Sequence, residues 1–93
     1  MDERLIKQWD VTKTLLAEAA RQIESSSFYA EYADFISHNE LELALDVLEA
    51  AGEEVSVNRD YWWNLKKAAE VMGLLNRLNA LRAKLREAGN ENS

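Results

Sequence analysis

The sequence predicts an all-α fold, a small antiparallel bundle of about four helices with a long C-terminal helix, forming a single domain over residues 1–93. The chain contains no proline and only three glycines, so little interrupts a helix. Apolar residues recur at spacings of three and four along most of its length. Only Val55-Ser56-Val57 alternates as a strand would, and this stretch is too short to form a sheet.

The first helix is predicted from Glu3 to Glu24, because a stripe of largely apolar positions repeats along it: Leu5, Trp9, Thr12, Leu16, Ala19 and Ile23. Serine side chains favour caps and turns, so Ser25–Ser27 should end this helix, and Ser26 or Ser27 should cap the next one. The second helix is short and aromatic, and the residues that share its face are Phe28, Tyr32, Phe35 and Ile36.

A third helix is expected to begin at Asn39, whose side chain would cap it in a capping box with Glu42, and to end at Ala51. Gly52 would then supply the left-handed residue that closes the helix. The apolar face of this helix is predicted to consist of Leu41, Ala44, Leu45, Leu48 and Ala51.

The last helix should begin at a cap provided by Ser56 or Asn58 and continue to about Ala88. Gly89 would end it before a disordered polar tail at residues 90–93.

A glycine and a row of leucines distinguish this last helix. Gly73 marks either a kink or a point of close packing. The leucine stripe is defined as Val71, Leu74, Leu78, Leu81 and Leu85. We expect it to pack on the first helix, with the two short helices across one end; the alternative is packing on a second copy of the chain.

Composition excludes several kinds of site. The chain has no cysteine and a single histidine, His38, so disulfides and the usual zinc sites are excluded and no cofactor is expected. His38 should cap or pack at a helix junction, and without a catalytic cluster around it we do not expect an enzyme. The chain lacks a signal-peptide pattern and an apolar run of about 20 residues, so we expect a cytoplasmic protein with no membrane contact.

The net charge of −6 is concentrated in the middle of the chain. Residues 24–60 contain ten acidic side chains and one basic side chain, Arg59, for a net charge of −9. The third helix carries an acidic stripe, defined as Glu42, Asp46, Glu49 and Glu53. Like charges at i, i+4 destabilise a helix, and no lysine or arginine lies between them. The stripe is either a solvated face that aids solubility or a surface that recognises a cationic partner; its one-sided charge favours recognition.

In the recognition hypothesis, the central contacts are Glu42, Asp46 and Glu49, and the surrounding contacts are Glu31, Asp34 and Glu53. Reversing the three central charges should leave the apolar core intact. The run Tyr61-Trp62-Trp63 is either core or the source of an interface anchor, and Trp62 is assigned to the partner surface.

Four basic residues near the C-terminus raise the question of nucleic acid: Arg77, Arg82, Lys84 and Arg86. The negative net charge and the lack of an aromatic platform beside them argue against direct binding of nucleic acid.

A family resemblance is carried by three stretches of the chain: Phe35–Asp46, Trp62-Trp63 and Ala68–Leu74. The shared features are a His-x-Glu turn at His38-Asn39-Glu40, a helix with Ala44 at its centre, and Met72-Gly73-Leu74. Over residues 28–75 the chain resembles small helical immunity proteins of bacterial polymorphic toxin systems. These include the group associated with Maf adhesin toxins and some immunity proteins of contact-dependent growth inhibition.

The resemblance implies a protein that binds and neutralises a cognate toxin domain, often a ribonuclease, in the bacterial cytosol. The acidic stripe is compatible with that role, because a nuclease presents a cationic groove to phosphates. The alternative is a homodimeric helical-bundle adaptor or structural module joined through the leucine stripe. Whether the chain is a monomer or a homodimer is left open by the sequence.

Overall fold

The chain folds into five α-helices and one short 3-10 helix, and a computed structural model describes residues 3–90. The elements are α1 (Glu3–Ala20), η1 (Arg21–Ile23), α2 (Phe28–Ser37), α3 (Leu41–Glu54), α4 (Arg59–Met72) and α5 (Leu75–Asn90). No strand occurs among the described residues, so the predicted all-α class is confirmed. The last three residues of the predicted polar tail lie outside the described range.

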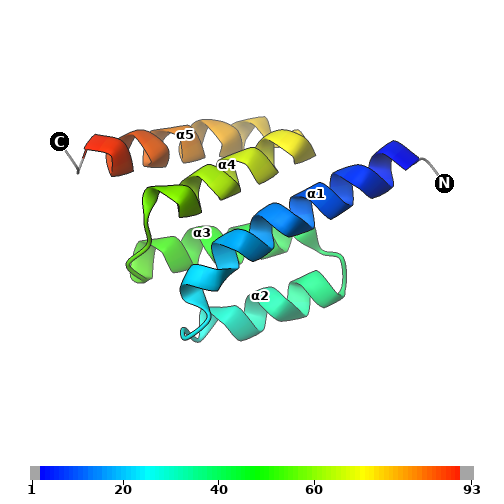
Figure 1. Cartoon of the computed structure of the whole chain (residues 1–93), viewed down its shortest axis with the longest axis horizontal. Helices are drawn as coiled ribbons and strands as arrows, with labels where there is room; N and C mark the ends of the chain where they lie inside the picture. Colours follow the sequence, from blue (N-terminus) through cyan, green and yellow to red (C-terminus); the bar gives the residue numbers. More distant parts are fainter. Residues whose placement is uncertain (1–2, 91–93) are drawn as a thin grey trace.

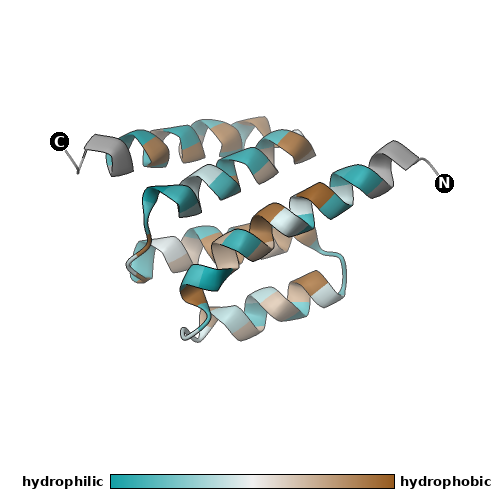
Figure 2. Cartoon of the chain, in the orientation of Figure 1, coloured by the Kyte–Doolittle hydropathy of each residue, from teal (hydrophilic) through white to brown (hydrophobic). Residues whose placement is uncertain are grey.

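Figure 1 shows α5 and α2 at opposite edges of the molecule, with α1, α3 and α4 between them. α1 packs mainly on α4, α2 on α3, and α5 on α4. Figure 2 shows that hydrophobic and hydrophilic residues alternate along the helices, as expected when each helix buries one side. The largest fully buried side chains are Thr12, Leu16, Ile23, Leu45, Leu48, Tyr61, Leu65 and Leu81.

The predicted first helix is nearly correct, because α1 continues through η1 to Ile23. Four members of its stripe are buried: Thr12, Leu16, Ala19 and Ile23. Trp9 departs from the stripe, since 47% of its surface is exposed, and the side chain of Leu5 lies outside the described part of the chain. The expected serine cap at the start of the second helix does not form. The hydroxyl of Ser26 donates to the carbonyl of Ile23, 2.7 Å away, and no side-chain hydrogen bond caps the start of α2.

The turn between α2 and α3 corrects the predicted role of Asn39. Asn39 has a φ of 58°, and its N–H donates to the carbonyl of Ile36 while the N–H of Glu40 donates to the carbonyl of Phe35. These two bonds form the motif that closes a helix with a left-handed residue. Asn39 therefore ends α2 instead of capping α3, and α3 has no side-chain cap. Asparagine suits the position because its short polar side chain tolerates the left-handed region.

Gly52 does not close a helix as predicted. Gly73, which the sequence predicts to mark a kink or a point of close packing, ends a helix instead. Gly73 has a φ of 73° and ends α4, with the N–H of Leu74 donating to the carbonyl of Ala69. Gly52 lies inside α3, where a Cβ atom would stand 2.5 Å from the ring of Trp62. The left-handed residue that closes a helix is thus Gly73, and the point of close packing between helices is Gly52. The expected closure at Gly89 is also wrong, since α5 continues to Asn90.

The break at Gly73 replaces the predicted long C-terminal helix with the α4–α5 pair. The leucine stripe is split by this turn, and its buried members, Leu78 and Leu81, belong to α5, which packs on α4. The expected pairing of the first helix with the last is therefore correct for α4, on which α1 packs mainly, and wrong for the leucines of α5, which packs on α4 instead.

The start of α4 confirms the predicted cap at Asn58. Its side-chain oxygen accepts from the N–H of Tyr61 at 3.2 Å and from the amide of Gln22 at 2.8 Å. The backbone N–H of Asn58 donates in return to the side-chain oxygen of Gln22 at 3.0 Å. This cap therefore also joins α4 to η1.

Replacing Gly52 by alanine should lower the free energy of unfolding by about 1–3 kcal/mol, because the new methyl group overpacks the contact with Trp62. Without that contact, alanine would stabilise the interior of a helix by roughly 0.5–1 kcal/mol. Urea unfolding followed by circular dichroism measures the difference. A neutral or stabilising Gly52→Ala variant would contradict the close approach of α3 and α4.

Replacing Gly73 by alanine should cost about 1–2 kcal/mol for a different reason, the strain of a left-handed residue that carries a Cβ atom. Apart from the adjacent residues of the chain, no atom lies within 4 Å of a Cβ atom placed on Gly73, so steric contact between helices does not contribute. Gly73→Asn is the matched control, and its smaller cost in the same unfolding assay would separate backbone strain from packing.

Candidate functional site

The third helix has two faces, as the sequence predicts. All five predicted apolar residues are buried: Leu41, Ala44, Leu45, Leu48 and Ala51. The acidic stripe lies on a different side of α3, and the side chains of Glu42, Asp46 and Glu53 are 44–59% exposed. The predicted core of this helix is therefore confirmed, and the stripe reaches the surface.

Three of the four carboxylates of the acidic stripe are paired within the molecule by two basic residues of α5. Arg77 places Nη2 3.4 Å from a carboxylate oxygen of Glu42, forms an ion pair with Asp46, and donates from Nη1 to the backbone carbonyl of Glu42 at 3.3 Å. Lys84 forms an ion pair with Glu53 and lies over the ring of Trp62, 5.9 Å from its centroid. The stripe is thus a contact between α3 and α5 as well as a surface.

The pKa values of both basic groups respond to this arrangement. Partial burial works to lower the pKa of Arg77, but the hydrogen bond to Asp46 and the neighbouring carboxylates outweigh burial and raise it. The hydrogen bond to Glu53 is the main cause of the raised pKa of Lys84. Both side chains are therefore held in their charged forms at neutral pH.

Sequence reasoning missed these two partners, although a signal was present. Arg77 and Lys84 are seven residues apart, as are Asp46 and Glu53. Residues spaced by seven lie on one side of a helix. Two helices that run in the same direction can therefore match these charges in register, but only the turn at Gly73 places α5 beside α3.

Glu49 is the most buried member of the acidic stripe. Its Oε1 atom is buried and has no hydrogen-bond partner in the described structure. Burial raises the pKa of Glu49, the positive charge of Arg77 lowers it, and the negative charge of Asp46 raises it further. Such a residue is poorly placed to act as a central surface contact.

Two further predicted contacts, Glu31 and Asp34, are exposed on α2. Among the described residues, neither of their carboxylates pairs with a lysine or an arginine. His38 stands at the end of this helix, with Nδ1 2.8 Å from the Asp34 carbonyl and 3.8 Å from its carboxylate. That backbone hydrogen bond is the main cause of the raised pKa of His38. The expected capping role of His38 is confirmed, and the acids of α2 are the ones left open to a partner.

The aromatic run divides between the core and the surface. Tyr61 is fully buried, and its hydroxyl donates to the carbonyl of Leu48; burial raises the pKa of that hydroxyl. Trp62 is only 7% exposed, whereas Trp63 is 43% exposed. The exposed ring is therefore Trp63, and the assignment of Trp62 to the partner surface is not supported by its burial.

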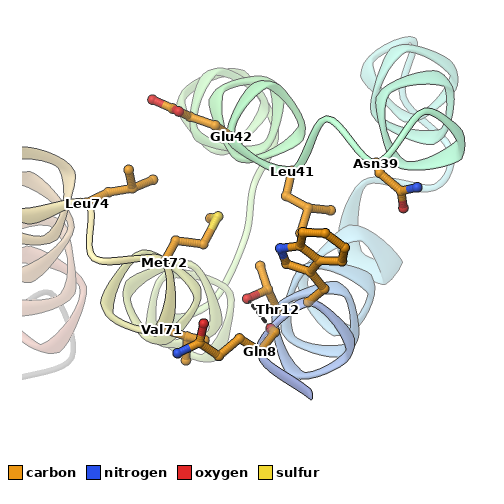
Figure 3. Close-up of a pocket in the computed structure, with 9 residues that line it drawn as sticks. Gln8, Thr12, Asn39, Leu41, Glu42, Val71, Met72 and Leu74 are labelled. Carbon is orange, nitrogen blue, oxygen red and sulfur yellow. Dashed lines mark hydrogen bonds between the residues drawn. The ribbon is translucent and has the colours of Figure 1, made fainter. Parts of the chain in front are cut away.

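A mainly apolar hollow of about 410 Å³ opens between α1, the start of α3 and the end of α4 (Figure 3). Figure 3 shows Leu41 and Met72 extending toward the gap and Glu42 pointing away from it. The remaining lining residues are Gln8, Trp9, Thr12, Asn39, Val71 and Leu74. Two of the stretches that carry the family resemblance, Phe35–Asp46 and Ala68–Leu74, meet at this hollow.

No family model, curated protein or solved structure matches this chain. In the part of the chain that the structure describes, no three histidine, cysteine, aspartate or glutamate side chains gather as a metal site requires. Within the same range, no helix has both the length and the apolar character needed to cross a bilayer. The charge and geometry of the surfaces are therefore the basis for assigning a function.

Replacing Glu49 by glutamine should raise the free energy of unfolding at neutral pH, because it removes a half-buried charge that lacks a hydrogen-bond partner. The folded-state pKa of Glu49 is raised, so the native state binds the proton more tightly than the unfolded state. The wild type therefore loses stability as pH rises from the unfolded pKa through the folded pKa, and the variant should lack this loss.

Urea unfolding between about pH 4 and pH 7 measures the effect. Glu54→Gln on the exposed end of α3 is the matched control, since it removes one charge without burial. Equal pH dependence in the wild type and Glu49→Gln would contradict the strained position of Glu49.

Proposed function

We propose that the protein is an immunity-type inhibitor that binds a basic toxin domain, such as a ribonuclease, through the acidic surface of α2 and the adjoining edge of α3. The observation that carries this proposal is the segregation of charge. Residues 22–58 contain no lysine or arginine, and they form the whole of α2 and α3. Among the described residues the acids of α2 pair with no lysine or arginine, and the basic group near them is His38, 3.8 Å from the Asp34 carboxylate, so most of their charge remains available to a partner.

A ribonuclease needs a cationic groove to hold phosphates, and a helix that carries carboxylates can occupy that groove in place of RNA. Opposite potentials also increase the rate of encounter, which is valuable against a toxin that acts on entry. The fold supports such a role, because α2 lies at one edge of the molecule (Figure 1), and Glu31 and Asp34 are exposed on it. The resemblance to immunity proteins points to the same kind of partner.

The acidic stripe of α3 has a secondary part in this proposal. Glu42, Asp46 and Glu53 remain partly exposed while paired with Arg77 and Lys84. A carboxylate can accept several hydrogen bonds, so cations of a partner can share these groups at the edge of the interface. Reversing Glu42, Asp46 and Glu49 together is not a clean test, however. It would also break internal ion pairs and place a new charge at the half-buried position of Glu49.

The sharper experiment reverses Glu31 and Asp34 to lysine and measures binding to the toxin domain that we expect a neighbouring gene to encode. Association should slow by about tenfold or more, because the exposed charges act mainly on the rate of encounter. The free energy of unfolding should stay within about 1 kcal/mol of wild type, since both side chains are exposed. Surface plasmon resonance at two salt concentrations and a cell-protection assay give the readouts.

The matched control is Asp10→Lys with Glu18→Lys, which changes the net charge equally on the exposed side of α1. Its association rate should fall much less than that of the α2 variant. Equal slowing by both pairs would mean that only net charge matters. Full protection by a folded Glu31→Lys/Asp34→Lys variant, or a neighbouring gene without a toxin domain, would argue against the proposal.

The homodimeric adaptor is less well supported, because the leucine stripe that would join two copies is used inside the molecule. Leu78 and Leu81 are 6% and 1% exposed. We therefore expect sedimentation at micromolar concentration to give a monomer. A stable dimer under those conditions would favour the adaptor, and Leu75→Asp, at a position 70% exposed, would then test whether the exposed end of α5 joins the copies.

A further inference from the structure

A basic hollow of about 540 Å³ lies between α4 and α5, apart from the acidic surface. It is lined by Lys66 of α4 and by Asn79, Arg82, Leu85 and Arg86 of α5. Three cationic side chains, one amide and one apolar side chain therefore share a single concave site. This is an unexpected feature in a chain whose net charge is −6.

In the part of the chain that the structure describes, no carboxylate pairs with either arginine of the basic hollow. On α5, the positions three and four residues from Arg82 or Arg86 hold no aspartate or glutamate. Neither guanidinium forms an ion pair among the described residues, and the ammonium of Lys66 is 3.9 Å from the carboxylate of Glu70. Arg82 and Arg86 are themselves a like-charge i, i+4 pair, an arrangement that destabilises a helix.

The contrast with the other basic residues of α5 is informative. Arg77 and Lys84 lie on the side of α5 that faces α3, and carboxylates of α3 neutralise both. Arg82 and Arg86 instead line the hollow together with Lys66, the charged side chain that α4 contributes. The same helix thus carries one compensated pair of cations and one uncompensated pair.

We propose that the basic hollow binds a small phosphorylated ligand, with Lys66, Arg82 and Arg86 holding its phosphate oxygens. The planar guanidinium group matches two phosphate oxygens at once, and hydrogen bonds between charged groups are stronger than neutral ones. Asn79 supplies an amide donor, and Leu85 offers an apolar surface to the body of the ligand. This binding activity goes beyond the recognition of a toxin, because it uses different residues on a different pair of helices.

The charge distribution favours a small ligand over a long polyanion. A diphosphate group interacts mainly with charges within the screening length, about 8 Å at physiological ionic strength, where three cations line the hollow and Glu70 lies 3.9 Å from one of them, Lys66. An RNA strand would extend beyond the hollow over a molecule of net charge −6. We therefore assign the site to a compact phosphate group, and binding of RNA is an outcome of the test.

Isothermal titration calorimetry with pyrophosphate and with inorganic phosphate, at constant ionic strength in chloride, tests the proposal. Pyrophosphate should bind saturably and more tightly than inorganic phosphate, because two linked phosphates can engage all three cations. The variant Arg82→Gln/Arg86→Gln should bind pyrophosphate at least about tenfold more weakly. When pyrophosphate is added to the wild type, the changes in amide chemical shift measured by NMR should centre on the residues of the hollow.

The matched control is Lys7→Gln/Lys13→Gln, which removes the same charge from α1 and should change the affinity by less than about twofold. Thermal unfolding checks that both variants remain folded. Equal weakening in both variants, or no saturable binding of pyrophosphate, would overturn the proposal. Tighter binding of a short RNA than of pyrophosphate, lost in the arginine variant, would also overturn it and assign the hollow to nucleic acid.

Discussion

At Gly73 the backbone adopts a φ of 73° and sends α5 back along α4, and the pairing of charges between α3 and α5 depends on this turn. A continuous helix would carry Arg77 and Lys84 away from α3. The reversal instead brings them to Glu42, Asp46 and Glu53. One residue without a side chain therefore determines that the most acidic helix of the protein is partly neutralised from within.

The ion pairs that Arg77 and Lys84 of α5 form with α3 divide the acidic residues into two groups with different physical roles. The carboxylates of α3 hold α5 in place, and exposed ion pairs of this kind contribute only about 0–1 kcal/mol each to stability. The carboxylates of α2 pair with no lysine or arginine among the described residues and so retain their attraction for external cations. A charged residue on α3 is thus less available to a partner than an equally exposed residue on α2, which sequence spacing alone does not reveal.

Close approach between α3 and α4 is the second constraint on the architecture. Gly52 lets the ring of Trp62 pack directly on the α3 backbone, and the hydroxyl of Tyr61 reaches the carbonyl of Leu48. With these two rings in the interior, Trp63 is left at the surface beside Lys67, whose Nζ atom is 5.9 Å from the ring centroid. The close packing at a glycine therefore determines which of three adjacent aromatic residues meets solvent.

The sequence by itself determined the helical class, the apolar face of α3, most of the α1 stripe and the cap at Asn58. Each of these follows from interactions within one helix or one turn, where periodicity and local hydrogen bonding are sufficient. The same local rules predict a left-handed residue at a helix end but do not distinguish Gly52 from Gly73, since either could close a helix. Only the tertiary structure decided that Gly73 turns the chain, that Arg77 and Lys84 meet the acidic stripe, and that Lys66 joins Arg82 and Arg86. Those contacts join residues from separate helices, and their partners are set by how the helices pack rather than by spacing along the chain.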